Sequence, residues 1–353
     1  MTRARYDVEA LSRFVARLFA GEGLPEDHAA MVADALLTAN LRGVDTHGVV
    51  RVPAYMKRLR AGLLNPKPRM REANPMPVSF VLDADNAMGP VGAFTAIEAC
   101  MSRAAEFGVG ASTVRHSNHF GAASVYTVHA ARRGFIAIAM SPGARTLAPH
   151  GSRAPLLGTN PFAVAAPAGQ NPPWSLDMAA SVAARGHIRV AAQEGRSIPE
   201  GWALDEKGRP TTDPEAALNG VMLPFGGPKG SGLAMMVDIL AGVLAGSAFT
   251  GDIRDWVKDF TGPSDVGHFF LVVKVEAFMP AAEFADRMET AILRTKALPP
   301  AEGAAEVFYP GERSGRMEQE RRQNGIPLSG KAIVALAELA TTDCPFPEPV
   351  GER

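Results

Sequence analysis

The segment Asp45–Arg51 reads Asp-Thr-His-Gly-Val-Val-Arg and combines a proton-transfer group with an anion-binding group. A histidine titrates near neutral pH, so His47 could exchange a proton with a carbonyl oxygen, while the Thr46 hydroxyl orients it. Arg51 would face the same side of a helix, where its planar fork could bind a carboxylate at two points. This pattern suits a 2-oxo or 2-imino acid. A helix end with a half-exposed histidine explains the same spacing, and the segment alone leaves both readings open.

Four further polar or glycine-rich turns could bind a ligand. Arg115–Gly121 lies where an expected strand ends and a helix begins, a natural site for a cofactor diphosphate. Gly226–Gly232 also opens a helix, and its glycines permit close approach to a ligand while Lys229 adds a positive charge. The turn Gly158–Pro161 and the polar loop Gly311–Arg316 are weaker signals. Each of the four could equally be a structural turn or cap.

Other motifs in the chain match known binding sites only in part. Gly325–Ala332 has the spacing of a phosphate-binding P-loop, but Ala332 stands where a serine or threonine must bind magnesium. Gly108–Thr113 lacks the third glycine of a dinucleotide fingerprint and leads into a strand. His116 and His119 are three residues apart, without the carboxylate or thiolate partners that zinc would require. We therefore expect neither a Rossmann turn nor a metal site.

The elements that position these motifs follow an α/β pattern. Apolar residues at helical spacing predict helices near residues 8–20, 25–42 and 50–59, and the Pro- and Asn-rich stretch 64–77 marks a domain boundary. Strands and helices then alternate, while the turn-rich stretch 193–224 is expected to be a surface excursion. Strands are expected at residues 78–82, 111–115, 135–140, 162–166 and 268–275, and helices at 91–107, 122–133, 231–249, 281–296 and 331–339.

Composition excludes several classes of protein. The 353 residues are 46% hydrophobic, enough for a sizeable core, and 36 basic residues balance 37 acidic ones, so nothing favours nucleic acid or an anionic membrane. The longest apolar stretch, residues 233–249, contains Asp238 and is too short for a membrane span. Cys100 and Cys344 form no disulfide framework or zinc motif, and no signal peptide is visible. We expect a cytoplasmic protein with free thiols.

Taken together, the motifs resemble one family, the type-2 malate/L-lactate dehydrogenases. This family includes ureidoglycolate and sulfolactate dehydrogenases, diketogulonate reductases and the cyclic ketimine reductases that act on piperideine- and pyrroline-2-carboxylate. Each motif is weak alone, but six of them occur in the order found in the family. The resemblance covers nearly the whole chain, from Asp45–Gly48 to Asn324–Leu328. The six are Asp45–Gly48, Ser117–Gly121, Gly158–Pro161, Leu176–Ser181, Gly226–Gly230 and Gly267–Phe270.

The resemblance implies an α/β fold with a non-Rossmann NAD(P)-binding domain on a mixed sheet, and a helical domain formed by both chain ends. Residues 76–296 would form the cofactor domain, and residues 1–75 with 297–353 the helical domain. It also implies a homodimer with its active sites near the subunit interface, acting on a small carboxylate substrate, with no nucleic acid or membrane partner.

The resemblance also assigns roles to particular residues. His47 would be the proton donor or acceptor and Thr46 its relay partner, although the family usually has serine there, so the threonine methyl group changes the relay geometry. The substrate-binding residues would be Arg51, Thr159, Arg185 and Gly186. The cofactor-binding residues would be His119, Phe120, Gly121, Ala122, Ala123, Asp177, Met178, Ala179, Lys229, Gly230, Pro310, Gly311, Glu312, Arg313, Ser314, Gly315 and Arg316.

The expected reaction is hydride transfer between NAD or NADP and C2 of a small 2-hydroxy or 2-oxo acid, with proton transfer by His47. The alternative is a cyclic ketimine reductase of amino-acid catabolism on the same scaffold. A third reading is a relative that binds the nucleotide without turnover, against which the retention of His47, Arg51, Thr159, Asp177 and Lys229 argues.

Overall fold

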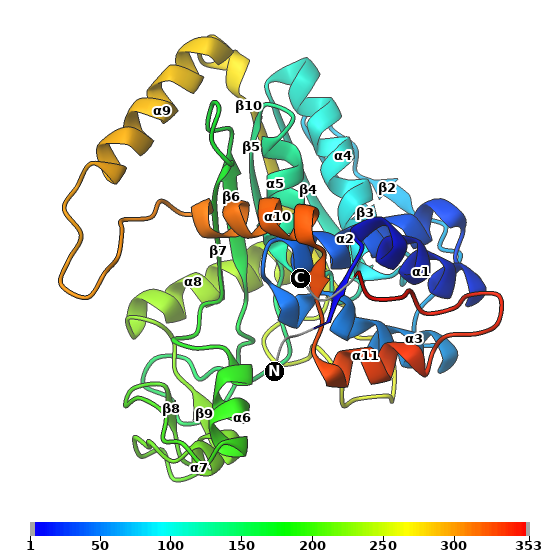
Figure 1. The fold of residues 1–353 in the computed structure, drawn as a ribbon, viewed down its shortest axis with the longest axis vertical. Helices are drawn as coiled ribbons and strands as arrows, with labels where there is room; N and C mark the ends of the chain where they lie inside the picture. The colour runs from blue at the N-terminus through cyan, green and yellow to red at the C-terminus, as the bar shows by residue number, and fades with distance from the viewer. Residues whose placement is uncertain (1–3, 351–353) are drawn as a thin grey trace.

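The centre of the molecule is a seven-stranded mixed sheet with the order β2-β3-β4-β10-β5-β6-β7 (Figure 1). The structure is a computed structural model that describes residues 4–350. Within the sheet β3 and β4 run parallel, and every other pair of neighbours is antiparallel. The strands are β2 (Arg71–Ala73), β3 (Ser79–Asp83), β4 (Val109–Ser117), β5 (Phe135–Met140), β6 (Phe162–Ala166), β7 (Trp174–Met178) and β10 (Val266–Lys274). The observed sheet confirms the expected α/β class with a mixed sheet.

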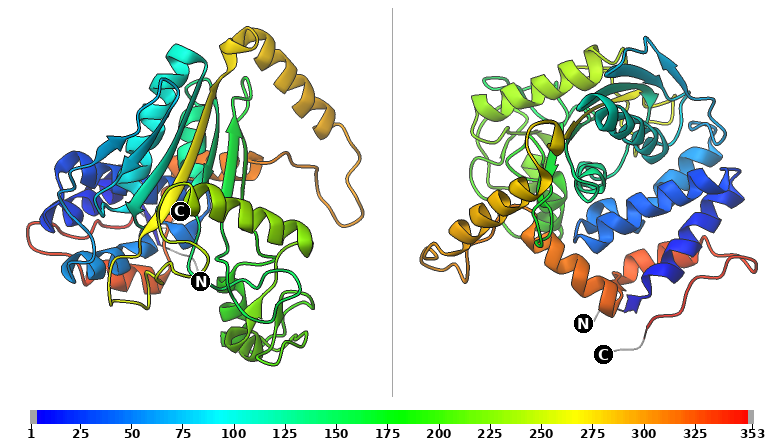
Figure 2. Two further views of the ribbon diagram at one scale, coloured as in Figure 1. Left: turned by 180° about the vertical axis from the view of Figure 1, so that it is seen from behind. Right: turned by 90° about the horizontal axis from the view of Figure 1, so that it is seen from above.

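Helices cover both faces of this sheet (Figure 2). On one face, α4 (Gly89–Phe107) packs on β4 and β10, and α5 (Ala123–Ala131) packs on β5 and β6. On the other, α8 (Pro228–Asp238) continues into the π-helical turn η3 (Ile239–Val243). Side chains of β10 alternate between the two layers, because neighbouring residues of a strand point to opposite faces. Phe270 joins the core formed with α4 and α5, and Phe269 joins the cluster beneath η3.

A layer of helices from both chain ends packs beside α4. Its main members are α1 (Val8–Gly21), α2 (Glu26–Leu41) and α3 (Val52–Arg60), and α2 lies between α1 and α4. The short pair of β1 (Arg5–Tyr6) and β11 (Ile326–Pro327) joins the two ends of the chain (Figure 1). One continuous apolar core runs through these helices and the adjoining sheet.

Residues 193–224 were expected to be a surface excursion, and this prediction is wrong. The stretch belongs to a small lobe with its own buried core, which includes Leu147, Ile188 and Ile198. Its elements are very short, so they lack the apolar periodicity that would reveal them in the sequence. They are α6 (Arg185–Gln193), β8 (Ala203–Leu204), α7 (Pro214–Asn219) and β9 (Val221–Met222).

The expected loop at Gly311–Arg316 is instead the start of helix α10 (Glu312–Asn324). This helix is polar throughout, so no apolar stripe predicts it. Ion pairs hold it in place: the buried Glu318 accepts hydrogen bonds from Arg42, just after α2, at 3.2 Å and from Arg132, just after α5, at 2.6 Å.

The helices expected at 281–296 and 331–339 are observed as α9 (Ala281–Lys296) and α11 (Gly330–Ala337). The short 3-10 helix η4 (Val275–Ala277), which was not expected, follows β10. The helix expected at 231–249 starts three residues earlier and ends as η3. Across residues 4–350, no helix has the length and apolar character needed to cross a membrane.

Candidate active site

The Asp45–Arg51 segment forms two short 3-10 turns, η1 (Asp45–His47) and η2 (Val49–Arg51), rather than the continuous helix its spacing suggests. The buried Asn40 side chain explains this geometry. Its amide nitrogen donates to the Asp45 carboxylate at 2.7 Å, and its oxygen accepts from the Val49 N–H at 2.8 Å. A Cβ at Gly48 would lie 2.1 Å from that oxygen, so only glycine fits between the turns.

A second clamp reaches this segment from the other end of the chain. Arg321 of α10 binds both carboxylate oxygens of Asp45, at 2.6 and 3.0 Å, and its guanidinium also donates to the Asn40 carbonyl. A two-point contact between a guanidinium and a carboxylate fixes orientation as well as distance. The turn that carries His47 is therefore held by both termini of the chain.

These turns bring six side chains from distant parts of the sequence together. We call them the histidine cluster: Thr46, His47, Arg51, Tyr55, His119 and Trp256. Thr46 Oγ1 lies 3.1 Å from His47 Nδ1, and Tyr55 Oη lies 2.7 Å from His119 Nδ1. The two imidazole rings stack with centroids 5.7 Å apart, and the Trp256 indole stacks on His119 at 4.3 Å.

The cluster keeps its histidines uncharged. Burial lowers the pKa of His47 to about 4, with the positive charge of Arg51 acting in the same direction. Burial lowers the pKa of His119 well below its usual value, helped by His47 and Arg51. Near neutral pH both rings are therefore neutral, and each can accept a proton.

Arg51 supplies the positive charge of this cluster. Its Nε donates to the Thr46 carbonyl at 2.5 Å, and its guanidinium carbon lies 5.2 Å from the centre of the Trp256 ring. Burial lowers the pKa of Arg51, and the positive charge of Arg189 adds to this effect. No carboxylate within residues 4–350 forms a salt bridge with Arg51, which leaves the charge available to an anionic ligand.

The expected substrate residue Thr159 lies in a tightly bonded turn. Its carbonyl accepts from the Ala180 N–H at 2.7 Å, and the Ala180 carbonyl accepts from the Phe225 N–H at 3.0 Å, just before the expected cofactor residues Lys229 and Gly230. The neighbouring Asn160 is fully buried and bonds Gly143 at 3.0 Å and Ala234 of α8 at 2.8 Å. The structure thus brings the 158–161, 177–180 and 225–230 segments together.

Arg185 and Gly186 lie at the start of α6 in the small lobe. The Arg185 guanidinium donates to the Leu218 carbonyl at 2.9 Å, so part of it is committed to the lobe. Its pKa is lowered by burial and by Arg189, and raised by the carboxylate of Asp255, next to Trp256. The charge of Arg189 acts on both Arg185 and Arg51, which places the α6 start near the histidine cluster.

The other expected cofactor residues converge at β7. The N–H of Ser124, in the first turn of α5, donates to the exposed Asp177 carboxylate at 3.1 Å, which joins residues 119–123 to residues 177–179. The Ser175 N–H donates to the Pro310 carbonyl at 3.0 Å, which places residues 310–316 beside the same strand. A Cβ on Gly311 would meet the backbone of residues 173–175, so that close approach requires glycine.

Two of the expected cofactor residues, Glu312 and Arg316, take part in an ion network with Lys296 and Glu306. Lys296 donates to Glu306 at 2.8 Å and to Glu312 at 2.9 Å, and Arg316 donates to Glu306 at 2.7 Å and to Glu312 at 2.5 Å. These side chains therefore hold the 296–316 segment. Arg313 is exposed and stacks on Phe308 at 4.1 Å.

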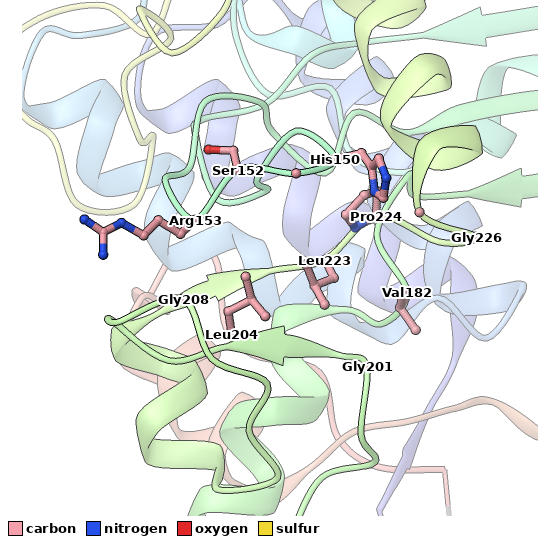
Figure 3. A pocket seen from close by; sticks show the side chains of 12 residues that line it. His150, Ser152, Arg153, Val182, Gly201, Leu204, Gly208, Leu223, Pro224 and Gly226 are labelled. Atoms are coloured by element: carbon pink, nitrogen blue, oxygen red, sulfur yellow. The ribbon is translucent and has the colours of Figure 1, made fainter.

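A cavity of about 490 Å³ lies beside these segments. It lies between the small lobe and the 150–153 loop, and the Gly226–Gly227 turn at the start of α8 forms one wall (Figure 3). His150 and Pro224 lie on the α8 side, whereas the Arg153 guanidinium extends away from the other lining side chains. Lys229 follows this turn, so the cavity adjoins the expected cofactor residues.

The sequence did not reveal the roles of Tyr55, Trp256, Asn40 and Arg321. None belongs to a recognisable motif, although Arg51, Tyr55 and Arg58 follow one another at helical spacing of four and three residues. Within the described residues, 4–350, no group of three or more His, Cys, Asp or Glu side chains could hold a metal ion.

Comparisons with known proteins identify the family of this chain. The family model described as malate/L-lactate dehydrogenase matches residues 6–337. Malate dehydrogenase from Pyrococcus horikoshii is 35% identical over 344 residues, covering 95% of this chain and 94% of the relative. The Delta(1)-pyrroline-2-carboxylate reductase of Ancylobacter novellus is 33% identical, covering 90% and 92%. The solved structure of sulfolactate dehydrogenase from Methanocaldococcus jannaschii superposes with a TM-score of 0.89 at 34% identity, covering 96% of each chain.

The chain therefore belongs to the malate/L-lactate dehydrogenase family, and the protein is an oxidoreductase enzyme. Dehydrogenases of this kind use a nicotinamide cofactor, and the residues at β7 fit one. The Asp177 carboxylate can accept hydrogen bonds from ribose hydroxyls, and the start of α5 can face a diphosphate.

Proposed function

We propose that this enzyme transfers a hydride between NAD or NADP and C2 of a small 2-hydroxy or 2-oxo acid, with His47 as the proton donor and acceptor. The observation that carries the proposal is the pairing of a neutral, half-buried His47 with Arg51, whose positive charge has no acidic partner within residues 4–350. A carboxylate on Arg51 would bring the adjoining C2 group to the imidazole.

Each side chain then has a defined task. The Nε of Arg51 already donates to the Thr46 carbonyl, so the two outer nitrogens of Arg51 bind the substrate carboxylate. Thr159 would bind the carboxylate side of the substrate as well. Thr46 engages Nδ1 of His47, which leaves Nε2 to face the substrate oxygen. The bound nicotinamide would supply or accept the hydride.

The low pKa of His47 fits this role. In the oxidation direction the neutral ring accepts the hydroxyl proton from the 2-hydroxy acid. In the reduction direction the ring must first be protonated, and the negative charge of the bound carboxylate favours this by offsetting Arg51.

Cyclic ketimine reduction is the second candidate. The pyrroline-2-carboxylate reductase relative is 33% identical along nearly its whole length, and a cyclic imine acid carries the same carboxylate next to its C2 group. His47 would then protonate nitrogen instead of oxygen, with Arg51 in the same role.

The cofactor would be held by residues 119–123, 177–179, 229–230 and 310–316. We propose a homodimer, for which the exposed apolar side chains Met235, Ile239 and Val243 on α8 and η3 offer a face. The division into a cofactor domain at 76–296 and a helical domain of both ends stays a prediction, and residues 1–3 and 351–353 of the latter lie outside the described residues. A cytoplasmic location is likewise a proposal, supported by two free, buried cysteines.

A nicotinamide absorbance assay tests the proposal. The protein is mixed with NADH or NADPH and either 2-oxo acids, such as pyruvate and oxaloacetate, or pyrroline- and piperideine-2-carboxylate. Preferential turnover of the oxo acids supports the primary proposal, and preference for the cyclic imines supports the second candidate. Tight NAD(P)H binding without turnover of either set would contradict both and favour a relative without catalytic activity.

A further inference from the structure

Arg51 is held in place without any acidic side chain from the described part of the chain, residues 4–350. The Nε of Arg51 donates a hydrogen bond to the Thr46 carbonyl, and the guanidinium carbon lies 5.2 Å from the centre of the Trp256 ring. An aromatic face attracts a guanidinium without using its N–H donors. A carboxylate partner would instead neutralise the charge and occupy the fork that the substrate needs.

Trp256 also contacts His119, one member of the histidine pair. Its ring stacks on His119 with centroids 4.3 Å apart and an interplanar angle of 22°, and its centroid lies 5.3 Å from that of Tyr55. His119 in turn stacks on His47 at 5.7 Å. The indole therefore excludes water from the sides of the His119 and Tyr55 rings that it contacts.

The loop that carries Trp256 is fixed to the helix that follows Arg51. Residues 250–265, here the Trp256 loop, contain no helix or strand. Arg58 of α3, only 1% exposed, donates to three carbonyls of this loop: Trp256 at 3.3 Å, Asp259 at 2.8 Å and Gly262 at 3.1 Å. Such multiple bonds from one buried guanidinium hold the loop at a defined distance from α3.

One face of α3 thus organises the whole arrangement. Arg51, Tyr55 and Arg58 follow at intervals of four and three residues, which places them on the same side of the helix. All three contact Trp256, by its ring or by its backbone. The acid-binding arginine and the tryptophan beside it are therefore positioned by the same eight-residue span, residues 51–58.

We propose that Trp256 is a positioning residue of the acid-binding pocket: its indole presents the Arg51 guanidinium to the substrate carboxylate and shields the His119–His47 pair from water. This inference rests on the proposed function for its kinetic test. It concerns binding of the acid rather than the chemistry at C2, so it also has a test that needs no turnover.

The kinetic test compares Trp256→Leu with Trp256→Phe. We expect Trp256→Leu to raise the KM for the acid about tenfold, since a desolvated cation–π contact is lost, while the cofactor Kd stays unchanged. Trp256→Phe keeps an aromatic face and should restore most of the affinity. Lower activity with an unchanged KM in Trp256→Leu would overturn the proposal, because a structural defect acts on the active fraction and not on KM.

The pH profile provides a second readout. Water admitted by Trp256→Leu would raise the low pKa of His47 toward its ordinary value. In the oxidation direction, which needs the neutral ring, the acid limb of kcat/KM should move from near pH 4 toward pH 6.5. An acid limb at the wild-type position in this variant would contradict the shielding role.

A fluorescence titration with oxalate, a planar analogue of a 2-oxo acid, separates this inference from the proposed function. We expect a saturable change in tryptophan emission in the wild type and in Trp202→Phe, a control in the small lobe. The change should disappear in Trp256→Phe. If it does so while the wild type turns over no acid, the proposed function fails and the inference stands. No emission change with oxalate in the wild type, or a change that persists in Trp256→Phe, would overturn the inference.

Discussion

The histidine cluster and the ion network at residues 296–316 differ in the partners of their positively charged side chains. In the cluster, Arg51 is held by a carbonyl and an indole, and the histidines bond hydroxyl groups. In the network, Lys296 and Arg316 each pair with two carboxylates. The cluster therefore offers a charge to a ligand, whereas the network uses its charges to hold its own backbone.

This difference distinguishes a region suited to binding substrate from a region that holds the backbone in place. An arginine without an acidic partner gains most when an anion arrives, so it suits substrate recognition. A closed network of opposite charges gains little from another charge and suits a segment that must keep its shape. The four predictions below test whether each region responds as its charge arrangement requires.

The largest effect is expected for His47→Ala. Loss of the proton-transfer group should reduce kcat about 10²- to 10⁴-fold, while the Kd of NADH or NADPH stays unchanged. Steady-state kinetics and a cofactor fluorescence titration measure the two quantities. Thr46→Ser is the matched control, since it keeps the hydroxyl that bonds His47, and it should retain most of the activity. Unchanged turnover in His47→Ala would transfer the proton role to His119, its stacked neighbour.

Arg51→Lys should have the next largest effect. Lysine keeps the charge but loses the two-point fork, so the KM for the acid should rise about tenfold with a smaller change in kcat. Arg189→Lys is the control, because its side chain acts on Arg51 only through its charge. Equal KM values for wild type and Arg51→Lys would remove Arg51 from the substrate pocket.

The sequence predicted the parts of the cluster that lie close together in the chain. His47, Thr46 and Arg51 fall within one six-residue span, so residue type and spacing were enough to indicate acid chemistry. The local geometry was missed: Asn40 and Gly48 make two 3-10 turns where helical spacing suggested a continuous helix. Such a turn depends on a side chain five to nine residues away.

Contacts between distant segments could not be predicted in this way. Trp256 is a lone tryptophan in a polar loop, and nothing in its neighbourhood indicates that it stacks on His119. The start of helix α10, residues 311–316, was expected as a loop because its residues are polar, and the helix packs through ion pairs to Glu318 rather than through an apolar face. The strands at 135–140 and 162–166 were correct to the residue, since each is a compact apolar run.

The third prediction concerns acid stability. Burial lowers the pKa of His47 to about 4 and that of His268, bonded to Ser117 and Ser141, to about 3. The unfolded chain, with histidine pKa values near 6.5, therefore binds more protons below that pH. Each such histidine should remove about 1.4 kcal/mol of stability per pH unit from 6.5 down to its folded pKa.

Denaturant unfolding between pH 7 and pH 5 measures this slope. His268→Gln keeps a donor and an acceptor for the two serines but does not titrate, so its stability should fall less steeply than that of the wild type. His150→Gln, at an exposed histidine, is the control and should follow the wild type. If the unfolding free energy of wild type and of His268→Gln fell with pH at the same rate, His268 would have the same pKa in the folded and unfolded states, which would contradict the prediction.

The ion network should contribute nothing in that pH range. Hydrogen bonds from Arg316 and Lys296 lower the pKa of Glu306 to about 2. A carboxylate with a lowered folded pKa stabilises the fold above its unfolded value and loses this effect only as pH falls from about 4.5 toward 2. The two regions therefore titrate in separate windows, with the histidines responding first on acidification.

The smallest effect is expected for Glu306→Gln. It removes one carboxylate from the network beside the expected cofactor residues, so the cofactor Kd should rise roughly two- to fivefold at low salt and approach the wild-type value at high salt. Glu283→Gln breaks an isolated pair with Arg287 on α9 and is the matched control, expected to leave cofactor binding unchanged. The KM defect of Arg51→Lys should persist at high salt, because the lost fork is geometric and partly buried. If salt abolished the Arg51 effect and left the Glu306 effect intact, the contrast between the two regions would be reversed.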